Sequence, residues 1–382
     1  MMDAQTPEGL IPSIVPEFVF FDDNGFGFRD SPEWGSASVI VPWLLYKWYG
    51  DAGIIKEAYP MMAKYLAYLQ KKSKNNILNY GLGDWYDNGP LRPGVVQLTP
   101  KGLTATAIYY YDASLLSSMA TMLNKKEDAV KFRQLSSAIK QSFTDSFFNA
   151  KTKLYATGSQ TAMAMPLSLG LVNAKDKAAV EKNMIDSITA SGKKLTAGDI
   201  GFHFLIEALY KGNASQLIYD MNSRDDVPGY GYQLKKGATA LTESWAALTE
   251  VSNNHLMLGH IQQWFYEGLG GINQAENGVG YQDIIIKPEL VGDISFVNAG
   301  RQTIYGTIVS EWKKSPGEFT LQVQVPANTK ATVYLPAKAT DVIKENNKPA
   351  AGRTDIKITG YENGRAKIEI GSGFYMFTVS TK

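Results

Sequence analysis

The hydrophobic and polar positions of this chain follow two different periods. From about residue 38 to residue 270, apolar residues recur at steps of three and four, the spacing that places them on one face of an α-helix. After about residue 280, apolar and polar residues alternate, which is typical of strands with one buried face. We therefore predict a helical domain over residues 1–280 and a β domain over residues 281–382, with the boundary near Asn277–Gly280.

The helical part contains about ten predicted helices, separated by short turns rich in Gly, Pro and Asn. Their ranges are 36–50, 50–73, 104–124, 126–149, 160–172, 177–190, 200–212, 214–223, 241–250 and 255–271. Antiparallel helix pairs in series are typical of a bundle or an α/α toroid. The sequence shows no strict repeat, which argues against a regular solenoid.

The last hundred residues or so contain eight short alternating segments between turns. Their ranges are 281–288, 293–300, 303–314, 318–326, 330–337, 355–361, 366–372 and 374–381. This pattern predicts a small antiparallel β-sandwich. The fold class is therefore mainly α with a β domain.

The charge balance excludes several classes of partner. With 38 basic and 37 acidic residues the net charge is +1, so we expect neither a nucleic-acid partner nor a membrane partner. The chain has no cysteine, which excludes disulfides and thiolate chemistry. The opening "MMDAQTPEGL" lacks the basic and apolar regions of a signal peptide, and the compartment stays unknown.

Four polar clusters with apolar flanks lie in predicted loops or helix starts. They are "RDSPEWGSA" with Asp30, Glu33 and Trp34, "GLGDWYDNGP" with Asp84, Trp85 and Asp87, "TAGDIGFHF" with Asp199 and His203, and the stretch with Glu243, Trp245 and His255. In an α/α toroid the loops at one end of the helices converge. Paired carboxyl groups there can protonate a leaving oxygen and activate water, as glycoside hydrolysis requires. Tryptophan offers a flat apolar platform for a sugar.

Each cluster also has a structural explanation. Asp199 could cap the helix that begins after it. His203 lies on the apolar face of that helix, where a core histidine is the simpler interpretation, and His260 has the same one. Glu243 falls at the start of a predicted helix, and Ala240, three residues before it, cannot complete a capping box. Its functional role is left open by spacing alone.

The remaining acidic residues can also be explained without a ligand. Asp84 and Asp87 could be turn residues beside glycines, and Glu33 could favour the positive end of the next helix. The segment "DDNGFGFRDSPE" places Asp22, Asn24, Gly27 and Glu33 at calcium-loop positions, but Phe26 occupies a ligand position. No P-loop or complete dinucleotide fingerprint is present, so we expect neither a metal nor a cofactor.

The motifs together resemble those of the bacterial α-L-rhamnosidases of glycoside hydrolase family 78. "GATALTESW", "SNNHLMLGH" and "WFY" are similar to the family segments "GATT-x-W-E-x-W", "S-x-N-H-Y-x-x-G" and "W-x-Y". "DAQTPEGLIP", "SPEWGSASVIVPWLLYKWYGD", "LGDWYD", "LTPKGLTATAIYYYD", "GSQTAMAMPL" and "TAGDIGFHFLIEAL" follow in the expected order. The resemblance covers essentially the whole chain, including the β-sandwich.

The resemblance implies an (α/α)6 toroid of the six-hairpin glycosidase type and an inverting hydrolysis that releases terminal α-L-rhamnose from a glycan or glycoside. The general base of the family falls on Glu243, the histidine that contacts the sugar on His255, and the pocket tryptophans on Trp34 and Trp85. Asp84 and Glu33 flank these tryptophans. The candidate substrate-binding residues are Trp34, Asp84, Trp85, His255 and Glu33.

Three residues depart from the family pattern, and they leave the exact sugar open. Ser36 stands where many members have Asp, which is typical of a subgroup. Leu241 replaces the tryptophan two residues before the base, and Leu256 replaces the aromatic residue after His255.

The resemblance also implies that parts of the enzyme lie outside this chain. The family's general acid is a glutamate upstream of the "DAQ" segment, and about two helices of the twelve would also precede it. We therefore expect a C-terminal part of a rhamnosidase whose full-length parent is periplasmic or secreted. Its partners would be the missing N-terminal part or a second copy, docked through an exposed apolar seam.

Two alternative functions remain at this stage. The chain could be a carbohydrate-binding remnant without turnover, or an enzyme that uses Glu33 or Asp84 as a substitute acid.

Overall fold

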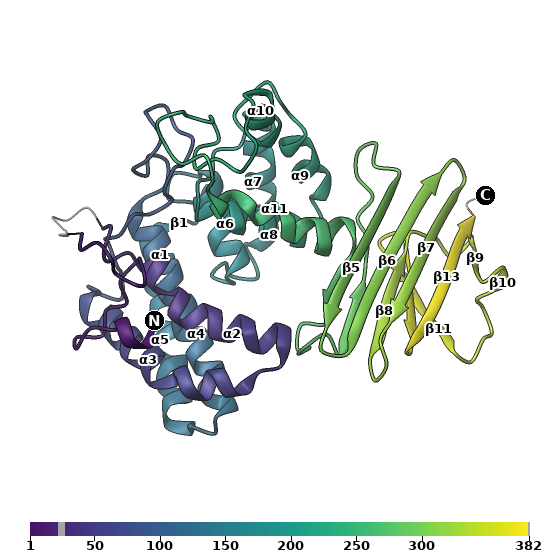
Figure 1. The fold of residues 1–382 in the computed structure, drawn as a ribbon, viewed down its shortest axis with the longest axis horizontal. Helices are drawn as coiled ribbons and strands as arrows, with labels where there is room; N and C mark the ends of the chain where they lie inside the picture. Colours follow the sequence, from purple (N-terminus) through teal and green to yellow (C-terminus); the bar gives the residue numbers. More distant parts are fainter. Residues whose placement is uncertain (22–26, 381–382) are drawn as a thin grey trace. The chain divides into compact units, whose positions relative to one another are not determined.

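The computed structural model describes residues 1–21 and 27–380, and contacts between residues divide the chain into two compact units. The helical unit comprises Met1–Leu44 and Ala52–His260 (Figure 1). The β unit comprises Leu45–Asp51 and Ile261–Lys382. This division lies earlier in the chain than the boundary that the hydrophobic period predicts at 277–280.

Most of the predicted helices are observed. The helices and short elements up to His260 are η1 (Met2–Ala4), α1 (Pro32–Gly35), α2 (Ala37–Tyr49), α3 (Ala52–Lys72), α4 (Lys101–Met122), α5 (Lys126–Phe147), β1 (Phe148–Asn149), β2 (Leu154–Tyr155), α6 (Gln160–Ser168), α7 (Lys177–Ala190), α8 (Gly201–Lys211), α9 (Ser215–Asn222), α10 (Tyr230–Lys235) and η2 (Leu256–His260). The first eight predicted helices correspond to α2 through α9. Among the described residues, no helix combines the length and the apolar character needed to cross a membrane.

Of the two predicted helices nearest the candidate base, the one over residues 241–250 is wrong, and the one over 255–271 is helical from Leu256 to Leu269 but changes its helix type along the way. Residues 241–250 form bends and turns, and residues 255–271 divide into η2, α11 (Ile261–Trp264) and the π-helical η3 (Phe265–Leu269). The Thr242 hydroxyl donates to the Ser244 carbonyl at 2.6 Å, and the Ser244 hydroxyl accepts from the Ala246 N–H at 3.2 Å. Such local side-chain bonds compete with the helical ladder, and they prevent a helix here.

Helix α4 lies in the core of the helical unit and is buried along most of its length. The Thr104 hydroxyl donates to Glu33 Oε1 at 2.6 Å, and Asp112 Oδ2 accepts from the Ser36 hydroxyl at 2.6 Å. Both bonds fasten the segment around α1 to α4. The "SPEWGS" motif is therefore fixed by polar contacts inside the core, where each bond is poorly screened.

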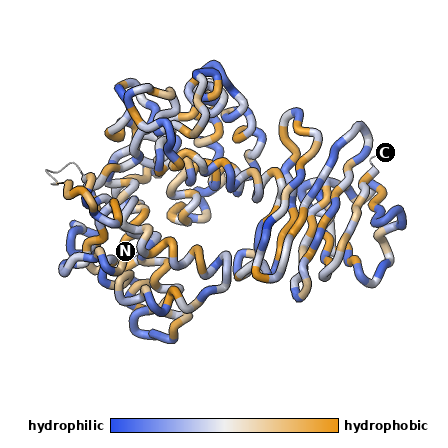
Figure 2. Tube along the Cα trace, in the orientation of Figure 1, coloured by the Kyte–Doolittle hydropathy of each residue, from blue (hydrophilic) through white to orange (hydrophobic). Residues whose placement is uncertain are grey.

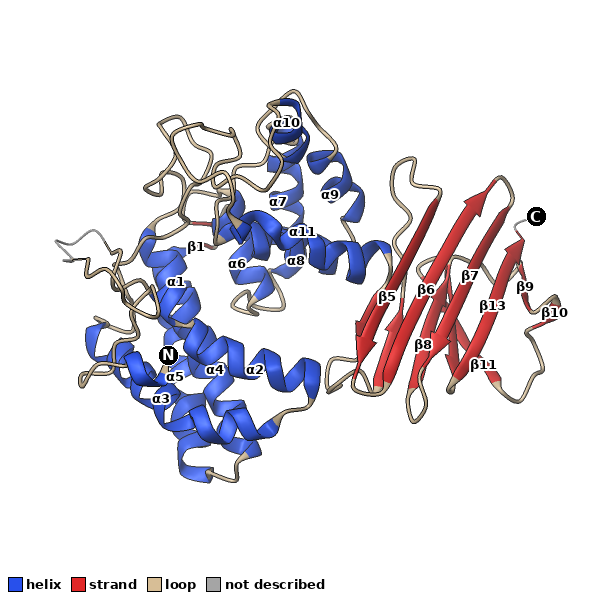
Figure 3. Ribbon diagram, in the orientation of Figure 1, coloured by secondary structure: helices blue, strands red, loops and turns tan. Residues whose placement is uncertain are grey.

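The β unit is a sandwich of two sheets (Figure 3). Its strands are β3 (Ile272–Gln274), β4 (Asp283–Ile286), β5 (Phe296–Thr303), β6 (Gly306–Ser315), β7 (Glu318–Val325), β8 (Lys330–Leu335), β9 (Val342–Glu345), β10 (Lys348–Pro349), β11 (Ile356–Glu362), β12 (Arg365–Ile370) and β13 (Gly373–Ser380). One sheet has the order β10-β9-β13-β7-β6-β5, and the other β11-β12-β8-β4-β3. All eight predicted strands are present, and β3, β9 and β10 are additional. The pairing is antiparallel except between β4 and β8, which run parallel.

The sandwich core follows from alternation along the strands (Figure 2). In β7, Leu321 and Val323 are fully buried, while Gln322 between them is only partly buried. The last helical turns also belong to this unit, because the Trp312 indole N–H donates to the Leu269 carbonyl at 2.7 Å. That contact, together with a bond from the Glu289 N–H to the Gly268 carbonyl, explains why the division falls before the predicted boundary.

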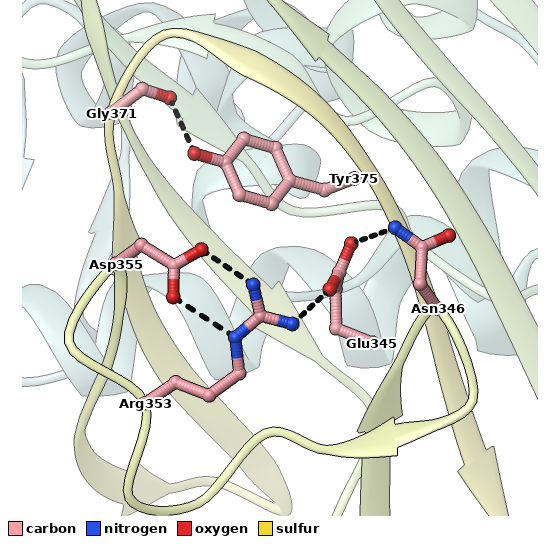
Figure 4. Close-up of polar contacts among 6 residues, drawn as sticks. All are labelled: Glu345, Asn346, Arg353, Asp355, Gly371 and Tyr375. Atoms are coloured by element: carbon pink, nitrogen blue, oxygen red, sulfur yellow. Dashed lines mark hydrogen bonds and ion pairs between the residues drawn. The ribbon is translucent and has the colours of Figure 1, made fainter.

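A charged network fixes the loop between β9 and β11. Arg353 donates to Asp355 Oδ1 at 2.9 Å through Nε, and it also donates to the buried Glu345 (Figure 4). Asn346 donates to the other Glu345 oxygen. Arginine presents several donors in a fixed plane, so one side chain can hold both carboxylates.

The β13 strand offers a matched test of the sandwich core. Phe377 is fully buried and Phe374 is 70% exposed on the same strand. We expect Phe377→Ala to lower the free energy of unfolding by about 3–5 kcal/mol, because it leaves a cavity. Phe374→Ala should change it by less than about 0.5 kcal/mol. Urea unfolding of both variants, followed by circular dichroism, checks this, and similar losses in the two would contradict the buried face assigned to β13.

Candidate active site

The four polar clusters of the sequence come together in the helical unit through a chain of contacts. The Leu82 N–H donates to the Ser31 hydroxyl at 2.9 Å, which joins the first cluster to the second. The Asp199 N–H donates to the Trp85 carbonyl at 2.8 Å, which joins the second to the third. Asp199 Oδ2 lies 3.7 Å from His255 Nε2, which brings in the fourth. Loops, drawn in tan in Figure 3, carry most of these residues.

Asp84 fastens the second cluster to the third. Its carboxylate accepts from the Gly201 N–H at 2.7 Å, from the Gly198 N–H at 3.0 Å and from the Thr161 hydroxyl. Burial raises the pKa of Asp84 to about 7, and these donors oppose the rise. All three donors are groups of the protein, so the Asp84 carboxylate accepts hydrogen bonds without a ligand. The use of Asp84 as a direct sugar contact stays a prediction, and the geometry gives it a positioning task.

The interpretation of Asp199 as the cap of α8 is wrong. Asp84 accepts the Gly201 N–H at the start of this helix, and Ile200 occupies the N-cap without a side-chain bond. The feature of the sequence that points to this close approach is the pair of glycines, Gly198 and Gly201. A Cβ at Gly198 would lie 2.2 Å from the Trp85 carbonyl oxygen, so only glycine permits the approach.

Asp199 is a buried carboxylate with an incomplete set of partners. Its side chain is 1% exposed, and Oδ1 has no hydrogen-bond partner among the described residues. Burial raises its pKa to about 6, His255 opposes the rise, and the charge of Glu243 adds to it. The sequence analysis did not predict the contact of Asp199 with His255, because the residues that surround Asp199 are distant along the chain.

Glu243 and His255 are held by a loop that folds back on itself. The Glu243 N–H donates to the Ser252 carbonyl at 2.9 Å, and the His255 N–H donates to the Leu241 carbonyl at 2.8 Å. Glu243 is half-buried, and its Oε2 accepts from the Ser252 N–H at 3.3 Å, a long bond. Asp199 and then Glu243 raise the pKa of His255, although partial burial opposes them.

Trp245 supports this loop from the core. Its side chain is 1% exposed, and its indole N–H donates to the Ala197 carbonyl at 2.8 Å. Phe202 and Tyr230 contact it edge-on, with ring centroids 4.9 and 5.1 Å away. Trp245 therefore fixes the loop and does not face a ligand.

Trp34 and Trp85 are half-buried, as pocket residues would be. Phe28 contacts Trp85 edge-on at 5.2 Å, and Tyr86 does the same at 5.5 Å. Phe28 also stacks on Phe21 at 5.6 Å. These neighbouring rings extend an aromatic surface from Trp85, and no sequence motif singled out Phe28 or Tyr86.

Glu33 and Asp87 are engaged within the protein. Glu33 accepts from the Thr104 hydroxyl and, at 2.7 Å, from the Ser31 hydroxyl, and burial raises its pKa. Asp87 is fully buried and accepts two backbone N–H groups from the loop that follows it. The geometry thus gives both carboxylates structural tasks. The use of Glu33 as a substrate contact or substitute acid stays untested, and its engaged oxygens do not favour it.

The histidines outside the loop and the acidic residues form no metal site among the described residues. His203 and His260 have ring centroids 5.1 Å apart, and burial lowers the pKa of both, to about 3 for His260. Of the calcium-loop residues, Asp22 and Asn24 lie outside the described part of the chain. Glu33, at the last position of that loop, is already bonded to the two hydroxyls above.

Comparison with known families and proteins shows which family has this arrangement of domains. Residues 1–269 match the bacterial α-L-rhamnosidase six-hairpin glycosidase domain, and residues 271–350 match the bacterial α-L-rhamnosidase C-terminal domain. An α-L-rhamnosidase of Streptomyces avermitilis is 30% identical over 390 residues, which cover 99% of this chain and 35% of that protein. One of Formosa agariphila is 28% identical over 98% of this chain and 41% of its own length.

Solved structures agree with this assignment. The α-L-rhamnosidase of Dictyoglumus thermophilum superposes with a TM-score of 0.88 at 28% identity, over 100% of this chain and 42% of that one. The Streptomyces avermitilis enzyme complexed with L-rhamnose gives 0.87 at 29% identity, over 99% of this chain and 35% of its own. The chain thus spans well under half the length of these relatives. The predicted fold class is confirmed, and the chain belongs to the bacterial α-L-rhamnosidase family, with a six-hairpin glycosidase domain followed by the C-terminal domain of that family.

Proposed function

We propose that this chain binds a terminal α-L-rhamnosyl group and that Glu243 is the general base of an inverting hydrolysis. The observation that carries the proposal is the back-folded loop 241–255, which carries a half-buried carboxylate, Glu243, close enough to the His255 imidazole to raise its pKa. The relative complexed with L-rhamnose, at 29% identity, supports the choice of sugar.

The chemistry requires one carboxylate that keeps an oxygen available for water. Among the described residues, the Glu243 carboxylate accepts one long hydrogen bond, at 3.3 Å from the Ser252 N–H, which a water molecule can replace. The base removes a proton from this water as it attacks the anomeric carbon, and the carbon–oxygen bond to the leaving group breaks on the opposite face. Glu243 is thereby protonated.

The leaving oxygen needs a proton from a second group. Asp84, Asp87 and Glu33 are buried and accept hydrogen bonds from the protein, so none of them is poised to deliver one. We propose that the acid comes from outside the four clusters. A substrate with a good leaving group depends less on this proton, so an aryl rhamnoside should be a better substrate than an alkyl rhamnoside.

Binding of the sugar is assigned to aromatic rings and one imidazole. Trp34 and Trp85 are half-buried and offer apolar faces to the C–H groups of a deoxyhexose. His255 is 27% exposed and can reach a hydroxyl group. A second candidate function, rhamnose binding without turnover, follows from the same geometry. Of the described carboxylates in the four clusters, Glu243 is the one that we infer to be available for catalysis, so the binding groups lack a second catalytic carboxylate.

Replacing the base should abolish most of any turnover. We expect Glu243→Gln to lower the rate on nitrophenyl α-L-rhamnoside by about 10²–10⁴-fold, because the attacking water loses its base. The matched control is Glu250→Gln in the same loop, where Glu250 is exposed and pairs with Arg92 at 3.3 Å. It should leave the rate unchanged. Equal rates for wild type and Glu243→Gln would refute the base assignment.

The aromatic platform can be tested by binding alone. We expect Trp85→Ala to weaken L-rhamnose binding, measured by calorimetry, by about tenfold or more, because the sugar loses its apolar contact. Trp85→Phe should lose less, since it keeps a flat ring. Saturable binding by wild type without turnover would favour the second function, and unchanged affinity in Trp85→Ala would contradict the platform.

A further inference from the structure

We propose that Asp199 is a positioning residue for His255, holding the Nε2 edge of the imidazole so that Nδ1 is presented to the sugar. The inference rests on the proposed rhamnose site. It concerns a carboxylate that the sequence analysis interpreted as a possible helix cap. In the structure Ile200, and not Asp199, occupies the N-cap position of α8.

The first argument is that a buried imidazole nitrogen and a buried carboxylate lie close to each other without a completed hydrogen bond. His255 Nε2 and Asp199 Oδ1 both lack hydrogen-bond partners among the described residues. The other carboxylate oxygen, Oδ2, lies 3.7 Å from Nε2. An unsatisfied buried polar group costs about 1–3 kcal/mol. A small rotation of the imidazole toward the carboxylate would satisfy both side chains, and catalytic hydrogen bonds often tighten in this way when a ligand binds.

The second argument is that the backbone on both sides of the pair is fixed. The Asp199 N–H donates to the Trp85 carbonyl at 2.8 Å, and the preceding Gly198 N–H donates to Asp84 Oδ2 at 3.0 Å. On the other side, the His255 N–H donates to the Leu241 carbonyl at 2.8 Å. Only the two side chains are left to adjust, so the carboxylate can determine the orientation of the ring.

The third argument is chemical. A histidine that donates through one ring nitrogen to a carboxylate has its tautomer set by that bond, which leaves the other nitrogen for a ligand. When the imidazole is charged, both nitrogens donate, and Nδ1–H can bond to a sugar hydroxyl. The neutral ring instead offers Nδ1 as an acceptor. The carboxylate therefore also influences which kind of hydrogen bond the sugar receives.

The carboxylates around the His255 ring both favour its protonated form. Asp199 and Glu243 face His255, and both raise its pKa. Burial raises the pKa of Asp199 to about 6, and the charge of Glu243 adds to this rise. Tyr86 lies in the field of Glu243, Arg92, Asp199 and Glu250. Above about pH 6, ionised Asp199 favours the imidazolium, and this stabilisation is lost as the pH rises through the raised pKa of His255.

The test uses the three histidines of the chain, whose ring C–H signals can be followed by nuclear magnetic resonance. In the wild type we expect His255 to titrate above 6.5, and His203 and His260 below it. Asp199→Asn keeps the shape of the side chain and removes its charge. It should lower the pKa of His255 by about one unit or more. The control Glu250→Gln, at an exposed position of the same loop, should leave that pKa within a few tenths of a unit of wild type.

L-Rhamnose affinity, measured by calorimetry from pH 5.5 to 8.5, completes the test. The affinity of the wild type should fall as His255 loses its proton, and in Asp199→Asn this fall should move to lower pH. A wild-type His255 that titrates below 6.5, or a pKa and pH profile unchanged in Asp199→Asn, would overturn the inference. A shifted His255 pKa in a protein that binds no rhamnose would support the pairing and refute the proposed function.

Discussion

The candidate site depends on one buried carboxylate. Asp84 accepts the backbone N–H groups of Gly198 and Gly201, and so joins the loop that carries Trp85 to the segment that carries Asp199. The positive end of α8 stabilises the negative charge there, and the missing Cβ of both glycines lets the two segments approach closely. Together with the bond from the Asp199 N–H to the Trp85 carbonyl, this contact fixes the aromatic platform relative to the carboxylate beside His255.

Carboxylates in this region therefore divide into two kinds. Asp84, Asp87 and Glu33 are buried, and each accepts two or more donors that hold loops in place. Burying an ionisable group is costly, but donors aimed at it compensate for lost water. Asp199 is intermediate, because it is buried and, in the described part of the chain, its carboxylate has a histidine at 3.7 Å as its one charged neighbour within 4 Å. Glu243 alone of these is near solvent, which is where a base that activates water must be.

Regular structure could be predicted from the sequence, and the contacts of the site could be predicted only in part. Helices α2 to α9 and eight of the strands follow from hydrophobic period, because each buries one face. The loop after Leu241 was predicted as a helix, since Trp245 and its apolar neighbours mimic the helical spacing. Local bonds of Thr242 and Ser244 and the buried indole of Trp245 decide otherwise. The capping of α8 by Asp84 joins residues 117 positions apart, a distance that no local pattern reveals.

The absence of a helix around Glu243 has a physical meaning. If one α-helix ran from Glu243 to His255, the twelve positions would separate their backbones by about 18 Å, at 1.5 Å per residue. No charge on one side chain would then act strongly on the other in water at ordinary ionic strength. The back-folded loop places both in the field of Asp199, and Glu243 contributes to the raised pKa of His255. Because an irregular loop forms few ladder bonds of its own, it depends on Trp245, which is buried and bonded to Ala197, to keep the base and the imidazole together.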